Sequence, residues 1–208
     1  MKKIFRTILI ILLFLPLIAV AHFIVFPQET RCMLIEYSDF KKQENIFYRK
    51  DVPATSIQQL IKIKKEAEKK VAIFWKDSEH INYKLIYCEA AEDYKNYGRE
   101  GAPAVVNIKM GAYVVIPKDM LDVNILSHEI SHTVLYRKIG WYKYRFKIPT
   151  WFDEGLAMQV DMRDYYSTDA LSRKNSGIIL PDVTQMNTPE KFRKGSNDQV
   201  ILNYLNAK

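Results

Sequence analysis

The sequence predicts an α+β fold in which short β-strands are followed by helices. Short apolar stretches between positions 81 and 116 are typical of strands, and residues 123–139 carry a helical pattern with clear ends. Of the 208 residues, 48% are hydrophobic and 26% are charged, which is the composition of an ordinary globular protein. A chain of this length can bury a substantial core without disulfides or metals to support it.

Residues 1–26 have the pattern of an export signal. Residues 1–7 are basic, and the 19 residues from Ile8 to Phe26 are almost all apolar. This pattern is typical of a signal peptide cleaved after Ala21, or of an uncleaved membrane anchor, which needs about 20 apolar residues. Because the apolar run continues past Ala21, we favour the anchor. In both cases the positive-inside rule places the rest of the chain outside the cytoplasm, either tethered by one helix or secreted.

Two cysteines, Cys32 and Cys88, follow this segment. In an exported chain such an isolated pair predicts a disulfide. The alternative is two unpaired thiols, one of them buried.

The formal net charge of +7 does not indicate a nucleic-acid partner. Three of the charges precede the apolar run, and many of the others lie between Lys62 and Lys70, where a solvated helix face explains them. The chain also carries no known nucleic-acid reader motif.

The first half of the chain predicts one helix and three strands. Residues 27–55 form a polar lead-in to a domain that we expect to span residues 56–208. The predicted elements are a helix over 57–76 capped by Ser56, a strand over 81–88, a loop over 89–103, and strands over 104–108 and 112–116.

The second half contains the clearest helix, over residues 123–139. Asp122 is its candidate N-cap, and Gly140 is a natural terminating residue. An aromatic and basic connector over 141–148 leads to a second helix that begins at Pro149 to Trp151. Thr150 and Asp153 resemble a capping box there, so we expect Asp153 to stabilise the first turn. Beyond Ser167 the chain is polar, with a last helix predicted from Asn197.

An HExxH motif lies within the clearest helix, as His128-Glu129-Ile130-Ser131-His132. Residues four apart lie one turn apart on one helix face, so both imidazoles can reach one zinc ion. Glu129 is rotated away from them and can take a proton from a water molecule on the metal. Chance spacing is the alternative, but two of the four histidines lie in this motif, and its apolar neighbours predict burial, where imidazoles need partners.

A catalytic zinc site needs a third protein ligand and one open position. No third histidine follows at the HExxHxxGxxH spacing, so the ligand must be a carboxylate. The segment Trp151-Phe152-Asp153-Glu154-Gly155-Leu156-Ala157 offers Glu154 at the start of the next helix. Gly155 and Ala157 are small and would allow the two helices to approach closely. The alternative for Glu154 is an acid favoured by the helix dipole, which accounts better for Asp153.

The two segments together resemble the gluzincin metallopeptidases, and most closely the small peptidase-MA-like proteins that carry HExxH and WFxEGLA. The resemblance covers about residues 104–162. It implies a zincin-like fold, with a small mixed sheet whose edge strand precedes the active-site helix and with a short helical C-terminal half. It also implies the zinc ligands His128, His132 and Glu154, with Glu129 as the catalytic base.

The resemblance further implies how a substrate would bind and react. Residues 112–116 would be the edge strand, to which a peptide substrate could add by strand pairing. Gluzincins usually add a Tyr or His that stabilises the oxyanion, and Tyr165, Tyr166 and Tyr204 are candidates. The function predicted is zinc-dependent hydrolysis of peptide bonds outside the cytoplasm. The alternative is a catalytically inactive, zinc-stabilised binding module, which the short C-terminal half favours and the intact Glu129 opposes.

Overall fold

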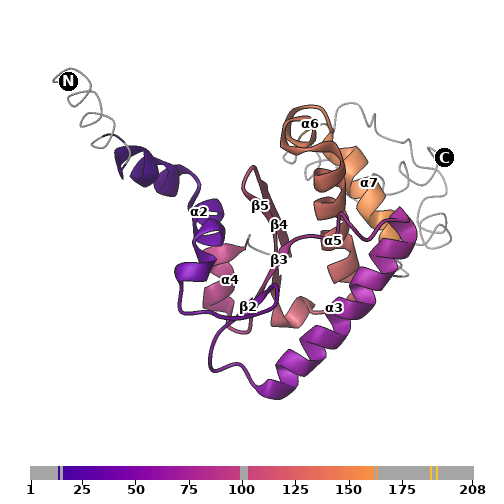
Figure 1. Cartoon of the computed structure of the whole chain (residues 1–208), viewed down its shortest axis with the longest axis horizontal. Coiled ribbons are helices and arrows are strands. Elements are labelled where there is room, and N and C mark those ends of the chain that lie inside the picture. The colour runs from indigo at the N-terminus through magenta and orange to yellow at the C-terminus, as the bar shows by residue number, and fades with distance from the viewer. Residues whose placement is uncertain are drawn as a thin grey trace.

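A five-stranded mixed β-sheet lies between two groups of helices in the computed structural model of the protein (Figure 1). The structure describes residues 14, 16–98, 103–161, 163, 188 and 191. The fold class is therefore α+β, as the sequence predicts.

The strand order in the sheet is β1-β2-β3-β5-β4. The strands are β1 (Lys41–Gln43), β2 (Ile46–Tyr48), β3 (Lys84–Cys88), β4 (Ala104–Ile108) and β5 (Gly111–Pro117). β2, β3 and β5 run parallel to one another, while β1 and β4 are antiparallel to their neighbours. β1 and β4 therefore form the two edges of the sheet.

Side chains of the central strands alternate between two apolar cores because successive residues of a strand point to opposite faces. In β5, Val114 and Ile116 join one core, and Tyr113 and Val115 join the other. Both faces of the sheet are therefore covered, and β3 and β5 are almost continuously apolar, as is usual for parallel strands.

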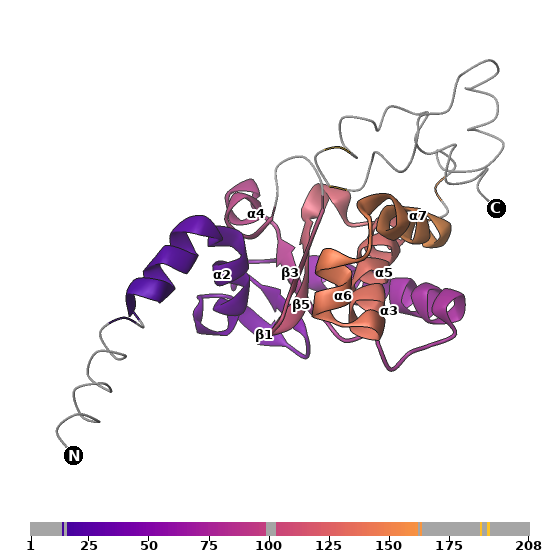
Figure 2. The same ribbon diagram turned by 90° about the horizontal axis from the view of Figure 1, so that it is seen from above.

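Different helices cover the two faces, as Figure 2 shows. The helices α3 (Ala54–Trp75) and α5 (Val123–Ile139) contribute to the core that contains Val114. The short helices α6 (Trp141–Phe146) and α7 (Thr150–Val160) pack against α5. The opposite face carries α2 (Pro27–Met33) and α4 (Ala91–Tyr97). The chain also forms two short 3₁₀ turns, η1 (Ile35–Tyr37) and η2 (Lys118–Met120).

Several element boundaries differ from the prediction. The expected lead-in over 27–55 contains α2, η1, β1 and β2, and thus supplies two strands of the sheet. The expected loop over 89–103 contains α4, and the connector over 141–148 contains α6. Ser56 does not cap α3, which begins directly after Pro53. Pro53 is the N-cap, with φ at −58° and ψ at 141°, so the helical backbone begins two residues before Ser56.

Both cysteines are free thiols in the structure, so the predicted disulfide is not present. Cys32 and Cys88 are both fully buried in the core on the α2 and α4 side of the sheet. The Cys32 thiol donates to the Tyr97 carbonyl at 3.8 Å, and burial raises its pKa to about 12. Apolar surroundings therefore account for both cysteines as small core residues.

The predicted N-terminal signal lies partly outside the described residues, which exclude residues 1–13 and Leu15. Residues 16–25 are helical. In the portion of the chain that is described, no helix combines the length and the apolar character needed to cross a bilayer.

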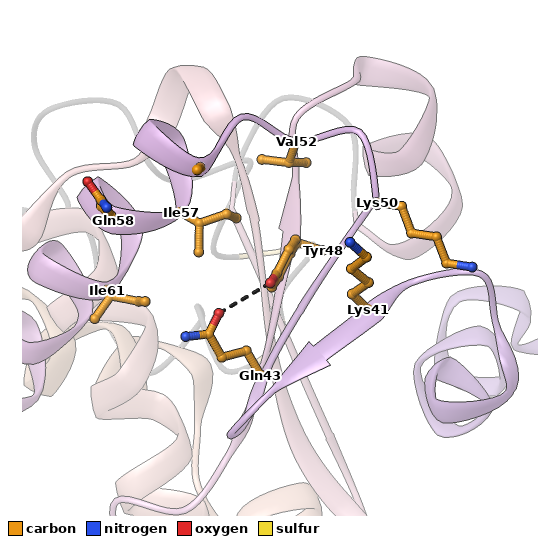
Figure 3. Close-up of a pocket in the computed structure, with 9 residues that line it drawn as sticks. Lys41, Gln43, Tyr48, Lys50, Val52, Ile57, Gln58 and Ile61 are labelled. Atoms are coloured by element: carbon orange, nitrogen blue, oxygen red, sulfur yellow. Dashed lines mark hydrogen bonds between the residues drawn. The ribbon is translucent and has the colours of Figure 1, made fainter.

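A shallow depression of about 330 Å³ lies beside β1, at the sheet edge opposite β4 (Figure 3). The β1–β2 hairpin and the start of α3 line it, and the Tyr48 hydroxyl donates to Gln43 Oε1 at 3.2 Å within it. Its lining contains two lysines and no histidine, cysteine or carboxylate. This depression therefore lacks the ligand types of a metal site.

Candidate metal centre

The helix α5 carries the HExxH motif and has the ends that the sequence predicts. Asp122 is the N-cap, and its carboxylate accepts the backbone N–H groups of Asn124 at 2.7 Å and Ile125 at 3.3 Å. Gly140 ends the helix with φ at 81°, a conformation that glycine adopts without strain. These two residues set where the helix begins and ends.

The predicted ligands His128, His132 and Glu154 come together between α5 and α7. Nε2 of His128 lies 3.3 Å from Oε2 of Glu154, and Nε2 of His132 lies 3.8 Å from the same oxygen. One ligand atom from each residue lies within 4.8 Å of the other two. Both histidines are buried and Glu154 is partly buried. The three residues are therefore positioned to bind a metal ion.

A second carboxylate contacts His132 at the ring nitrogen that faces away from Glu154. Nδ1 of His132 lies 2.7 Å from Oδ1 of Asp153, and the Tyr144 hydroxyl donates to Oδ2 of Asp153 at 2.6 Å. The expected capping role of Asp153 is wrong: α7 begins after Pro149, and no side chain caps it. The Asp153 carboxylate instead points across to α5, because an imidazole buried there needs a partner.

His128 has a carboxylate of its own on its Nδ1 side. Asp161 directly follows α7, its side chain is fully buried, and Oδ2 lies 3.6 Å from Nδ1 of His128. Nε of Arg163 donates to both oxygens of Asp161, at 2.9 and 3.0 Å. The 3.6 Å separation exceeds a hydrogen bond, so Asp161 acts on His128 through its charge.

Tyr144 and Asp161 are the two site residues that the sequence argument missed. Asp161 lies seven residues after Glu154, and seven residues are close to two full helical turns. Helical spacing from the proposed ligand could therefore have identified Asp161. Tyr144 lies in the connector, where no local pattern marks it.

The charges of the site hold its histidines and acids in opposite states. Burial alone would lower the pKa of both histidines, but the acids outweigh it. Asp161 and Glu154 raise the pKa of His128 to about 10, and Asp153 and Glu154 raise that of His132 to about 9. Burial favours a higher pKa for Glu154, but the two histidines lower it below its usual value. In the metal-free protein, the histidines and the acids therefore favour one another's charged forms.

Glu129 lies on the same helix but outside the group of three ligands. It is 9% exposed, and burial is the main reason that its pKa is raised above the usual value. Both histidines act in the opposite direction through their charges. Glu129 is thus a buried carboxyl group beside the candidate metal ligands with a raised proton affinity.

The edge strand beside the site is β4 and not the predicted strand over 112–116. β5 pairs with β3 on one side and with β4 on the other, so it lies inside the sheet. The amide of Asn107 in β4 donates to the His132 carbonyl at 3.4 Å, and the Tyr136 hydroxyl donates to the Ile108 carbonyl at 2.6 Å. These bonds fasten the β4 edge to the helix that carries the motif.

The predicted oxyanion-stabilising candidates Tyr165, Tyr166 and Tyr204 lie outside the described residues.

Comparison of the chain with protein-family models, with curated proteins and with solved structures found no match.

Proposed function

We propose that this protein is a zinc metallopeptidase of the gluzincin type, with a zincin-like fold, that hydrolyses peptide bonds outside the cytoplasm. The observation that carries the proposal is the convergence of His128, His132 and Glu154, with the buried carboxyl of Glu129 beside them. A structural zinc site would use a fourth protein ligand, whereas the described part of the chain brings three together, which would leave one position open for chemistry.

The donor set supports zinc as the metal. Two imidazole nitrogens and one carboxylate oxygen are common ligands of catalytic zinc, and bonds of about 2.0–2.1 Å in a tetrahedral site separate ligand atoms by roughly 3.3 Å. The distances of 3.3 and 3.8 Å from Glu154 to the two imidazoles are close to that value. Small side-chain movements would complete the coordination.

Zinc held by these residues would act as a Lewis acid that makes water acidic and polarises a carbonyl group. Glu129 would accept a proton as the water oxygen bonds to the carbonyl carbon of the peptide. It would then pass that proton to the amine nitrogen as the C–N bond breaks, which leaves a carboxylic acid and a free amine. A carboxyl group with a raised proton affinity suits a residue that must both take and return a proton.

The side of β4 that pairs with no strand among the described residues is the surface that we propose for the substrate backbone. An extended peptide could add to this edge as a further strand and so lie beside α5. The basic and apolar N-terminal segment supports a position outside the cytoplasm, tethered to a membrane.

Replacing Glu129 with glutamine tests the peptidase proposal against the binding-module alternative. Glutamine has nearly the same shape but cannot act as a base, so zinc content and fold should be unchanged. General-base contributions are typically about 10²–10⁴-fold in rate, so cleavage should fall by that factor. Zinc content and digestion of a diverse peptide library are measured for wild type and variant. If the zinc-loaded wild-type protein cleaves no peptide, the binding-module alternative is correct.

A further inference from the structure

We propose that an aromatic and basic patch on α6 binds the surface of an anionic lipid bilayer and so places the metal centre next to the membrane. The patch consists of the following side chains: Trp141, Tyr142, Lys143, Arg145, Phe146 and Lys147. The inference rests on the proposed function, because it assumes a chain already located beside a membrane. It adds a second contact with the bilayer, separate from the N-terminal segment.

The aromatic members of the patch form a continuous exposed surface. Tyr142 and Phe146 are 61% and 60% exposed, and Trp141 is 38% exposed. The ring of Phe146 lies between the other two, with centroids 5.7 Å from Trp141 and 5.3 Å from Tyr142. Exposed single aromatics are ordinary, but an exposed group of touching rings marks an interaction surface.

The basic members give the patch one sign of charge. Lys143, Arg145 and Lys147 are all exposed, and none forms an ion pair within the part of the chain that the structure describes. Residues 141–152 contain no aspartate or glutamate. The surface therefore matches a partner that is negatively charged and has an apolar layer beneath its charges.

An anionic bilayer has this combination of properties. Tryptophan and tyrosine prefer the boundary between lipid headgroups and acyl chains, and lysine and arginine are attracted to anionic headgroups. A surface-binding helix normally carries its basic and aromatic side chains in this way. A nucleic acid would also attract cations and rings, but the proposed location outside the cytoplasm argues against it.

The patch is directly connected to the metal centre. Tyr144 belongs to the same helix, but its side chain faces inward and donates to Asp153, the carboxylate that holds His132. Phe152, which is 39% exposed, precedes Asp153 on α7. A bilayer bound by α6 would thus lie close to the site, and the substrates would be peptide segments near the membrane surface.

The test uses the full chain, reconstituted through its own N-terminal segment into nanodiscs of phosphatidylglycerol or phosphatidylcholine with brominated acyl chains. Bromine quenches the fluorescence of tryptophans that enter the bilayer. The difference between wild type and Trp141→Phe isolates the contribution of Trp141 from those of Trp75 and Trp151. We expect strong quenching of Trp141 in phosphatidylglycerol, less in phosphatidylcholine, and a decrease with added salt.

A matched pair of charge variants tests the basic side chains. The first variant should lose the preference for phosphatidylglycerol; it combines Lys143→Gln, Arg145→Gln and Lys147→Gln. The control variant removes the same amount of charge from exposed positions of α3 and should keep that preference. The control combines Lys62→Gln, Lys65→Gln and Lys69→Gln. Equal loss in both variants would overturn the proposal, since net charge alone would then explain the binding. Absence of Trp141 quenching in every lipid would also overturn it and point to a protein partner.

The zinc content of each sample separates this inference from the proposed function. Quenching of Trp141 in protein that binds no zinc would leave the lipid contact intact and contradict the metallopeptidase. Normal zinc content without quenching of Trp141 would contradict the lipid contact and leave the proposed metallopeptidase intact.

Discussion

Three carboxylates, two from α7 and one from the residue that follows it, face the two histidines of this site. Glu154 faces both imidazoles, Asp153 contacts His132 and Asp161 lies next to His128. A carboxylate behind a ligating histidine fixes the orientation of the ring and increases its basicity toward the metal. The helix α7 therefore supplies one candidate ligand and the carboxylate that orients His132, and Asp161 directly after it places a negative charge beside His128.

Asp153→Asn should weaken zinc binding by about 10–100-fold, as expected for loss of an orienting carboxylate. Glu154→Gln, which removes a ligand, should weaken it further. Competition with a chelator of known affinity measures both. The control is Asp122→Ala, which removes the cap of α5 and should cost about 1 kcal/mol of stability with little change in zinc affinity. If Asp153→Asn lowers only stability, Asp153 acts as a first-turn acid after all.

Zinc uptake should release about two protons per chain near pH 7, because zinc binds neutral imidazole. In the metal-free protein the pKa values of His128 and His132 are raised to about 10 and about 9, so both rings are protonated there. Apparent zinc affinity should accordingly increase with pH up to that range. Calorimetry in buffers of different ionisation enthalpy counts the protons, and release of none would contradict the assignment of these residues.

The same pKa values predict how the stability of the metal-free fold depends on pH. A histidine whose pKa is raised by folding contributes stability that is fully present below about pH 6.5. That contribution is lost as the pH rises through 9 to 10.

At the scale of elements, the sequence predicts best where local chemistry sets both ends. The bounds of α5 follow from Asp122 and Gly140, and β4 follows from a short apolar run. The helices α4 and α6 are only seven and six residues long, too short to show a helical period, and packing on neighbouring elements stabilises them. The role of Asp153 does not follow from the sequence for a related reason: its partner His132 is on another helix, and local spacing predicts only the cap.

The packing of α3 on α5 should carry much of the stability of the site. Leu60 of α3 is fully buried in the core that also contains Leu126 and Ile130 of α5. Leu60→Ala should cost about 2–5 kcal/mol, because it leaves a cavity without touching a ligand. Lys62→Ala, an exposed change on the same helix, should cost less than about 0.5 kcal/mol. Urea unfolding followed by circular dichroism compares them, and equal midpoints would show that α3 is not part of the cooperative core.

At the scale of the whole molecule, strand order is the feature that local patterns could not supply. The sequence indicates strands over 104–108 and 112–116, but which of them forms the edge depends on the side to which the hairpin adds. β5 pairs in parallel with β3, which leaves β4 outside and beside α5. Long-range pairing thus decides which strand borders the candidate metal centre, and the edge proposed for a substrate is β4 instead of β5.

The orientation of the chain across a membrane decides whether the proposed hydrolysis takes place outside the cytoplasm. Lys2, Lys3 and Arg6 precede the apolar run, and residues 1–26 contain no acid to offset them. The positive-inside rule keeps this basic end in the cytoplasm, so a reporter fused after Lys208 should be active only if it works outside. A cytoplasmic reporter at the same position should be inactive, and activity there would refute the topology.

Replacing the three basic residues with glutamine should weaken the orientation, because the charge difference across the apolar run would then be lost.

The mass of the mature chain decides between an uncleaved anchor and cleavage after Ala21. An uncleaved chain would keep the metal centre at the membrane through its own N-terminus. A cleaved chain would depend on the patch of α6 for that contact, so the Lys143, Arg145 and Lys147 variant would then leave the membrane fraction altogether.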